Sequence, residues 1–203
     1  MTARLLEGKV FAAKLKEEAG KKAQELKAKY GITPGLAVII VGENPASQVY
    51  VRNKHKACTE LGFYSEGVEL PATTTREELL AEIQRLNNDE KIHGILVQLP
   101  LPKELQPYES EVLEAINPLK DVDGFHPVNV GRLVTGQKAL VPCTPHGCPR
   151  MLELAEIPVE GANAVIIGRS NIVGKPMFHL LLGKNATVTI CHSRTRNLSE
   201  ILK

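Results

Sequence analysis

The hydrophobic pattern of residues 35–100 alternates between two periods. "GLAVIIVG" (35–42) is a short, largely β-branched run bounded by glycines, which predicts a buried strand. Helical periodicity follows over 45–61, where Asn44 is placed to cap the helix and Gly62 to end it. We therefore expect a strand followed by a helix.

The same alternation continues toward residue 100. "YSEGVELP" and "GILVQLP" predict two more strands, and "TTTREELLAEIQRLNNDEK" between them predicts a helix capped by its threonines. Strands separated by helices predict a parallel sheet with helices packed on it. Ligands of such sheets bind at the carboxyl ends of the strands, so we expect a site near Gly42 and Gln98.

A second α/β unit is predicted near the end of the chain. From about residue 120 the sequence is rich in Gly, Pro, Asp and Asn, which favours loops. A helix (146–156) and a strand (163–169) follow, and then a helix opening in "SNIVGKPMFHLLLGKN" and a strand at 186–193. This order is typical of a nucleotide-binding unit.

These elements predict an α/β fold with two domains. Residues 1–140 are expected to form an N-terminal parallel-sheet domain, and residues 141–203 a Rossmann-type nucleotide-binding domain. One strand-helix-strand unit would leave an unprotected sheet edge. We therefore expect an incomplete nucleotide domain and a chain that is a fragment or truncated form.

The composition, 43% hydrophobic and 24% charged, is that of a soluble globular protein. The formal net charge of +2 provides no basic field that would attract nucleic acid or an anionic membrane. The lysine-rich N-terminal segment lacks a continuous apolar core, and no stretch reaches membrane-spanning length. We expect a cytoplasmic protein without nucleic-acid or membrane partners.

The four cysteines, Cys58, Cys143, Cys148 and Cys191, show no disulfide framework and no C-x-x-C pair, which fits a reducing compartment. "CTPHGC" places His146 between two of them. Structural zinc needs four ligands in two spaced pairs, and the second pair is missing. We therefore expect no metal site.

Tyr50 and Lys54 lie four positions apart, on one face of the predicted helix. Lysines on helix surfaces are usually solvated, and the neighbouring Arg52 suits a wet, basic face. The alternative is a catalytic couple. Gln98 favours it, because an amide in an otherwise apolar strand needs polar partners. A lysine held near apolar surface is usable as a proton acceptor, with Tyr50 orienting the amine or the substrate.

Asp121 and Asp123 lie two positions apart in "KDVDGFHP". Aspartate favours turns through local side-chain hydrogen bonds. A carboxylate can also bind a nitrogen heterocycle by accepting two N–H bonds. The residues alone leave both interpretations open.

The segment "IIGRSNIVGKP" follows a predicted strand and opens a predicted helix, where phosphate-binding loops lie. Its small residues, Gly168, Ser170 and Gly174, depart from G-x-G-x-x-G, so a tight turn remains an alternative to a dinucleotide site. Arg169 after the first strand and Ser193 after the second favour a ribose 2′-phosphate over a free hydroxyl. The predicted cofactor is therefore NADP rather than NAD.

Six segments together resemble the bifunctional methylenetetrahydrofolate dehydrogenase/cyclohydrolase family of the FolD type, along essentially the whole chain. They are "YVRNKHKAC", "EIQRLNNDEKIHGILVQLPLP", "KDVDGFHPVNVGRL", "PCTPHG", "GRSNIVGKPM" and "NATVTICHS". The resemblance implies two domains that flank a cleft, in a homodimer. The activity that it implies is oxidation of 5,10-methylenetetrahydrofolate with NADP and hydrolysis of the methenyl product to 10-formyltetrahydrofolate, in one-carbon metabolism and purine biosynthesis.

The resemblance also implies roles for folate-site residues. Lys54 matches the catalytic lysine, Tyr50 and Gln98 match its neighbours in the folate cleft, and Asp123 matches the residue that binds the pterin ring. The tasks of positioning a substrate, making a water nucleophilic and moving a proton suit this set.

Five further residues match cofactor positions of the family. Gly168, Arg169, Ser170 and Ser193 match NADP-contacting positions, and Thr144 matches a position near the nicotinamide. The family's "PGGVGP" segment and final helix are absent from the 203 residues. If the molecule stops at Lys203, we expect weakened cofactor binding and impaired dehydrogenase activity.

Two other functions stay open on the sequence alone. One is a folate-binding or dimer-forming module without full catalysis. The other is a two-domain NADP dehydrogenase that acts on a different small substrate.

Overall fold

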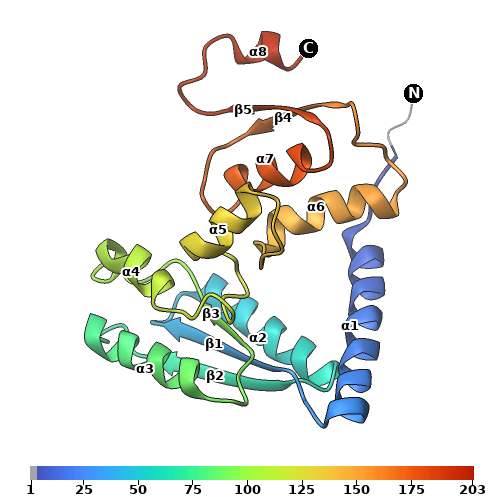
Figure 1. The fold of residues 1–203 in the computed structure, drawn as a ribbon. Helices are drawn as coiled ribbons and strands as arrows, with labels where there is room; N and C mark the ends of the chain where they lie inside the picture. Colours follow the sequence, from blue (N-terminus) through green and yellow to red (C-terminus); the bar gives the residue numbers. More distant parts are fainter. Residues whose placement is uncertain (1–3) are drawn as a thin grey trace. The chain divides into compact units, whose positions relative to one another are not determined.

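The computed structural model describes residues 4–203 and divides them into two compact units (Figure 1). Residues 12–122 form one unit, and residues 4–11 together with 123–203 form the other. In chain order the elements are α1 (Gly8–Tyr30), β1 (Gly35–Val41), α2 (Pro45–Glu60), β2 (Tyr64–Leu70), α3 (Arg76–Asn88), β3 (Gly94–Val97), η1 (Gln106–Tyr108), α4 (Glu109–Glu114), α5 (Pro127–Val134), α6 (Cys143–Leu154), β4 (Asn163–Ile167), α7 (Gly174–Leu182), β5 (Thr187–Cys191) and α8 (Leu198–Ile201). The predicted domain boundary at residue 140 stays a prediction.

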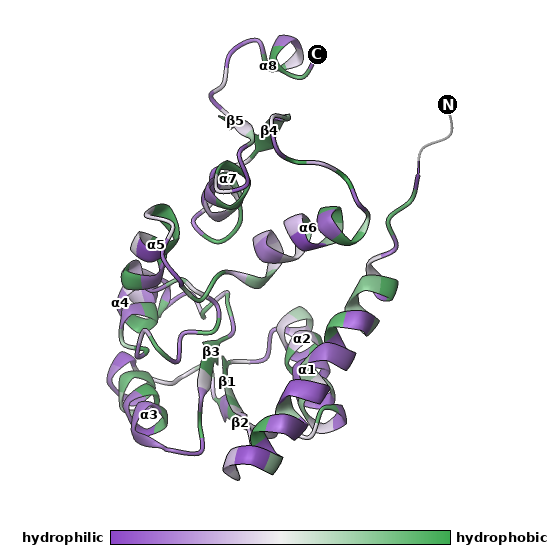
Figure 2. Cartoon of the chain, turned by 45° about the vertical axis from the view of Figure 1, so that its right-hand side comes forward, coloured by the Kyte–Doolittle hydropathy of each residue, from purple (hydrophilic) through white to green (hydrophobic). Residues whose placement is uncertain are grey.

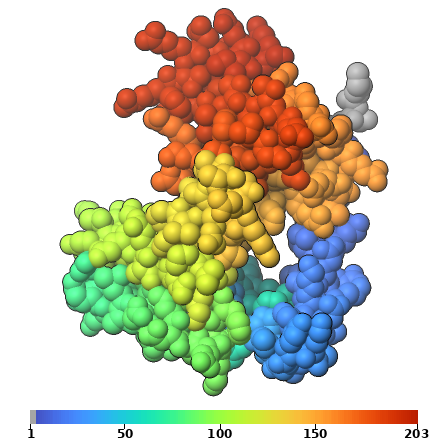
Figure 3. Space-filling view, viewed as in Figure 1, coloured from blue at the N-terminus to red at the C-terminus, as the bar shows by residue number. Residues whose placement is uncertain are grey.

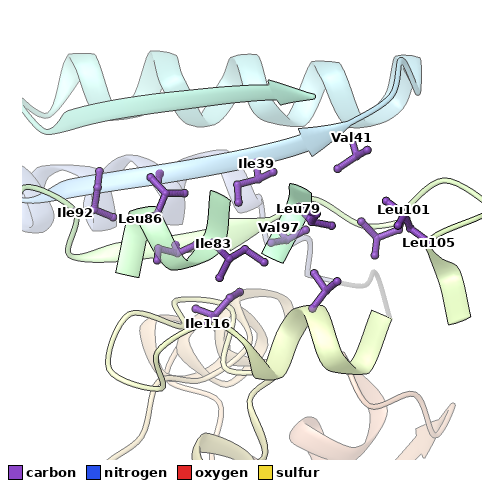
Figure 4. Close-up of a cluster of buried hydrophobic side chains, with 13 residues drawn as sticks. Ile39, Val41, Leu79, Ile83, Leu86, Ile92, Val97, Leu101, Leu105 and Ile116 are labelled. Atoms are coloured by element: carbon purple, nitrogen blue, oxygen red, sulfur yellow. The ribbon is translucent and has the colours of Figure 1, made fainter. Parts of the chain in front are cut away.

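The unit of residues 12–122 is built on a parallel sheet with the strand order β2-β1-β3. Side chains alternate along β1. Ile39 points into a cluster that includes Ile83 of α3 (Figure 4). Val38 and Ile40 instead pack with Val51 of α2. The two helices therefore cover opposite faces of the sheet, and the predicted strands and helices of this region are confirmed.

Polar side chains fix the starts of both covering helices. Asn44 Oδ1 accepts a hydrogen bond from the backbone N–H of Ser47 at 3.1 Å. Thr75 Oγ1 accepts from the N–H of Glu78, whose carboxylate accepts from the N–H of Thr75 in return. The predicted caps are confirmed, and each satisfies backbone donors that a helix cannot satisfy itself.

Polarity along the chain follows this packing (Figure 2). β1 and β3 are apolar, whereas α1 is largely hydrophilic and buries only Ala23 among its residues.

α4 packs beside α3 (Figure 3), where Arg76 donates to Glu111 and lies 5.6 Å from the ring centroid of Tyr108. Within residues 4–203, no helix combines the length and the apolar character needed to cross a membrane.

The other unit carries a parallel pair of strands, β4 and β5, against which α7 packs. The expectation of loops after residue 120 is wrong for 127–134, which form α5. Pro127 occupies the first turn of α5, and Nδ1 of His126 accepts a hydrogen bond from Val128 N at 3.1 Å. The helix thus begins on a proline whose fixed φ suits that place, with an imidazole as its cap.

Three predicted boundaries also differ from the structure. β3 ends at Val97, so Gln98 follows the strand instead of lying in its middle, although its N–H still donates to Ile39 O. β4 ends at Ile167, so Gly168 and Arg169 lie in the loop after it. α6 begins at Cys143, a few residues before the expected start.

Candidate functional site

Lys54, Tyr50 and Gln98 come together in the unit of residues 12–122. The Nζ of half-buried Lys54 donates to Gln98 Oε1 at 3.0 Å and lies 5.7 Å from the ring centroid of Tyr50. The last distance is within the range of cation–π attraction. The predicted contact between Lys54 and Gln98 is therefore present, although 44 residues separate the two in sequence.

The side-chain amide of Gln98 is held by the backbone carbonyl of Leu99 as well as by Lys54. Its Nε2 donates to Leu99 O at 2.7 Å, and its N–H donates to Ile39 O of β1 at 2.8 Å. With the amide nitrogen occupied, the amide oxygen is presented to the Lys54 amine. This bond confines a long, flexible side chain to one place, which is the first requirement for delivering an amine to a bound substrate.

Tyr50 presents its side chain to solvent, with 61% of its surface exposed. Its ring lies beside the amine of Lys54, and the two residues are one helical turn apart on α2. An exposed aromatic ring of this kind can stack on a flat ligand while its hydroxyl offers a hydrogen bond. The solvated-surface interpretation thus fits Tyr50 before a ligand binds, and Lys54 less well.

A hollow of about 530 Å³ lies between α2 and β2, and Arg52, His55 and Glu69 are among its lining residues. None of Tyr50, Lys54 and Gln98 lines it. Among the lining residues, His55 connects α2 to the edge strand β2 through a 2.7 Å hydrogen bond between its Nδ1 and Ser65 Oγ.

Asp123 and Thr144 belong to the unit of residues 123–203. Asp123 is half-buried and directly precedes Gly124, whose φ is +66° and whose backbone lies close to Leu140 and Val141. Thr144 is exposed in the first turn of α6. The approach of either residue to Lys54 stays a prediction.

The loop between β4 and α7 makes close backbone contacts at its first residue, Gly168, and where it joins α7 at Gly174. Gly168 has a φ of +132°, and its N–H donates to Cys191 O at 2.7 Å. A Cβ atom on Gly174 would lie 2.1 Å from Gly168 O, so only glycine allows this close approach. Ser170 Oγ accepts from Val173 N at 3.1 Å and from Gly174 N at 3.3 Å.

The Ser170 hydroxyl therefore accepts from two backbone N–H groups at the start of α7, whose N-cap residue is Val173. Its two acceptor contacts leave the hydroxyl hydrogen as a donor for a bound group. The arrangement combines a hydroxyl donor, an α-helix N-terminus and a glycine that lets this helix pack closely on the loop after β4, which are features of dinucleotide-binding turns. The residues present thus fit NADP.

Arg169 and Ser193 lie at the same edge of the β4–β5 pair. Ile167 pairs with Cys191 in the parallel register, and each predicted residue stands two positions beyond one member of that pair. Both are exposed. A guanidinium and a hydroxyl at adjacent strand ends suit a 2′-phosphate.

Two residues that the sequence analysis did not single out shape the turn that carries Ser193. His192 N donates to Thr195 Oγ1 at 2.8 Å, and Thr195 N donates to His192 O at 2.8 Å. His192 Nδ1 also accepts from Arg194 N at 3.1 Å. The cluster of polar residues directly after the predicted strand was the available signal, because such side chains form local turns.

Within residues 4–203, no three His, Cys, Asp or Glu side chains are grouped so that they could hold a metal ion. Cys143 and Cys148 are both exposed and form no disulfide, and Cys148 Sγ donates to Thr144 O at 3.6 Å.

Two family models match the chain. The model described as tetrahydrofolate dehydrogenase/cyclohydrolase, catalytic domain, matches residues 6–123, and the model of the NAD(P)-binding domain of the same enzymes matches residues 142–203. The bifunctional protein FolD of Halalkalibacterium halodurans is 57% identical over the whole chain, which covers 72% of that relative. The FolD protein of Moorella thermoacetica is 59% identical over 98% of the chain, which covers 70% of it.

Solved structures agree with these relatives. The bifunctional enzyme FolD from Campylobacter jejuni matches with a TM-score of 0.93 at 52% identity, over 98% of this chain and 70% of that one. FolD from Trypanosoma brucei, solved with NADP cofactor and an inhibitor, matches with a TM-score of 0.92 at 38% identity, over 99% of this chain and 69% of that one.

The fold and the matches define a class of α/β proteins in which a catalytic domain is followed by a Rossmann-like NAD(P)-binding domain. Within that class, the chain belongs to the tetrahydrofolate dehydrogenase/cyclohydrolase family. The predicted fold class and the resemblance are confirmed.

Proposed function

We propose that this protein oxidises 5,10-methylenetetrahydrofolate with NADP and hydrolyses the methenyl product to 10-formyltetrahydrofolate. The observation that carries the proposal is the hydrogen-bonded pair of Lys54 and Gln98 beside the Tyr50 ring, inside the region that matches the catalytic-domain family. Relatives named bifunctional FolD and a neighbour solved with NADP support the same activities.

Hydride loss from the methylene carbon leaves a cationic carbon between two nitrogens. When bound, NADP supplies the acceptor for that hydride. Arg169 and Ser193 would hold its 2′-phosphate, Ser170 and the backbone at Gly168 would hold the phosphate bridge, and Thr144 would lie near the nicotinamide. The task of these residues is to orient the cofactor, because hydride transfer depends on distance and alignment.

Hydrolysis needs a water oxygen to bond to the cationic carbon and one proton to leave that oxygen. The bond from this carbon to N5 then breaks, N5 takes a proton, and the second proton leaves the oxygen as the formyl C=O bond forms. Lys54 is the group placed to hold the water and move these protons, with Gln98 fixing the amine and Tyr50 covering the ligand plane. Asp123 would bind the pterin ring by accepting two of its N–H bonds.

We further propose the division into a folate domain (1–140) and an NADP domain (141–203), action as a homodimer in the cytoplasm, and no nucleic-acid or membrane partner. The family matches at 6–123 and 142–203 support the division. The small net charge of +2 supports the absence of polyanionic partners.

Turnover of 5,10-methylenetetrahydrofolate tests the proposal, with the conjugated methenyl product followed by its absorbance. We expect turnover with NADP and slower turnover with NAD. Arg169→Ala is expected to reduce this preference by about tenfold through loss of one charged contact. Lys138→Ala removes an exposed positive charge elsewhere in the same unit and serves as the matched control. Absence of turnover with either cofactor would overturn the proposed function.

A further inference from the structure

Lys120 lies in the segment that follows α4, and its amine binds the end of another helix. Its Nζ donates to three backbone carbonyl oxygens at the C-terminus of α3, those of Leu86 at 3.2 Å, Asn87 at 2.8 Å and Asp89 at 2.8 Å. An ammonium group has three donors, so all of them are used. The last carbonyls of a helix have no partner within it and carry the negative end of its dipole, which makes a cation there favourable.

Other hydrogen bonds tie the same segment down. The Asn87 side chain accepts from Asn117 N at 2.9 Å and donates to Ala115 O at 2.8 Å. Lys120 O accepts from Ile95 N of β3 at 2.7 Å. Residues 115–120 are thereby fastened to the end of α3 on one side and to β3 on the other.

Contacts with β3 and the core continue along the chain to Val122, the residue before Asp123. Asp121 is 1% exposed and pairs with Ile95 as an isolated parallel bridge beside β3. Val122 packs against the smaller core cluster, and a Cβ atom on Gly94 would lie 2.4 Å from its Cγ1. Consecutive contacts therefore hold the chain up to Val122, the residue directly before Asp123.

We propose that Lys120 is a positioning residue for folate binding. Its ammonium fixes residues 117–122 on α3 and β3, and thereby sets the point from which the Asp123 carboxylate reaches the pterin ring. The inference rests on the proposed function, because it gives Lys120 a role only through the folate contact of Asp123.

A double-mutant cycle tests this coupling. Binding of tetrahydrofolate is measured for the parent chain, Lys120→Met, Asp123→Asn and the double variant, together with the KM for NADP and the thermal midpoint of each. Lys120→Met is expected to weaken folate binding about tenfold, with the KM for NADP unchanged. Because Lys120 acts through Asp123, the double variant should bind folate no more weakly than Asp123→Asn alone.

Three further variants keep the test decisive. Lys120→Arg retains a cation with several donors and should recover most of the affinity. Lys91→Met removes an exposed lysine close to the same helix end and should leave folate binding unchanged. If Lys120→Met does not fold, Asn87→Ala loosens the same segment and is expected to weaken folate binding in the same way.

Parent-like folate affinity in Lys120→Met, with or without a lower thermal midpoint, would overturn the inference. So would additive losses in the double variant, since they would show that the two residues act separately. A parent chain that binds no tetrahydrofolate would be a different failure, because it would remove the proposed function itself.

Discussion

Gly67 of β2 has no room for a side chain, because the imidazole of His55 lies against it. A Cβ atom at this position would lie 2.4 Å from His55 Nε2 and 3.0 Å from Cε1. To reach an ordinary contact distance in Gly67→Ala, the ring must move by about 1 Å. That movement strains or breaks the 2.7 Å hydrogen bond between His55 Nδ1 and Ser65 Oγ.

The cost of Gly67→Ala follows from three terms. Loss of the hydrogen bond costs about 1 kcal/mol, and forcing an extra methyl group into a packed contact costs about 1–3 kcal/mol. Replacing glycine by alanine in extended backbone returns roughly 0.5–1 kcal/mol by restricting the unfolded chain. We therefore expect the free energy of unfolding to fall by about 1–3.5 kcal/mol.

Urea unfolding followed by circular dichroism measures this loss as a lower midpoint at unchanged slope. Gly147→Ala in α6 is the matched control, since its added Cβ would meet nothing within 4 Å. Removing the imidazole in the double variant His55→Ala, Gly67→Ala should abolish the steric part of the cost. A Gly67→Ala protein as stable as the parent would refute the packing of α2 on β2 through His55.

Three other outcomes follow from the contacts described. Ile83→Ala empties a fully buried position of the larger core cluster and should cost about 2–5 kcal/mol in thermal unfolding, so an unchanged midpoint would contradict that core. Gly174→Ala places a Cβ 2.1 Å from Gly168 O and should weaken NADP binding by about tenfold or more in a cofactor titration, whereas parent-like binding would refute the phosphate-loop role. The Lys184 amine holds the pKa of Glu153 below its ordinary value of 4.5, so the stability contributed by this pair is present above pH 4.5 and lost as pH falls through the lowered pKa. The midpoint difference between the parent and Glu153→Gln should therefore shrink on acidification, and a difference that grows would have the wrong sign.

Much of the fold could be predicted because local signals and packing agree. The β-branched run of 35–42 and the cap formed by Thr75 with Glu78 each predict one element, and both elements form as expected. α5 could not be predicted, because 127–134 combine a proline, a glycine and an asparagine with three valines, all weak helix formers. That helix depends on its packing against α7, a tertiary contact that periodicity does not report.

The part of the candidate site that lies at the ends of the strands could be predicted from the order of strands and helices. The shared edge of β1 and β3 brought Lys54 to Gln98, as the rule for parallel sheets requires. The role of Lys120 could not be predicted, because a lysine that binds carbonyls more than thirty residues away has no sequence signature. Gln98 was expected inside a strand, but it is the residue directly after β3. Its side-chain oxygen still accepts the hydrogen bond from Lys54.

Lys54→Met tests the central claim most directly. The variant keeps most of the apolar length of the side chain but removes the amine that Gln98 holds, so it should retain oxidation of 5,10-methylenetetrahydrofolate with NADP at reduced rate. It should lose hydrolysis of the methenyl product by about a hundredfold or more, as expected for removal of a proton-transfer group. The measurement follows methenyl formation and decay in the parent and the variant. Accumulation of the methenyl product in the variant supports the account, whereas hydrolysis at the parent rate would contradict it.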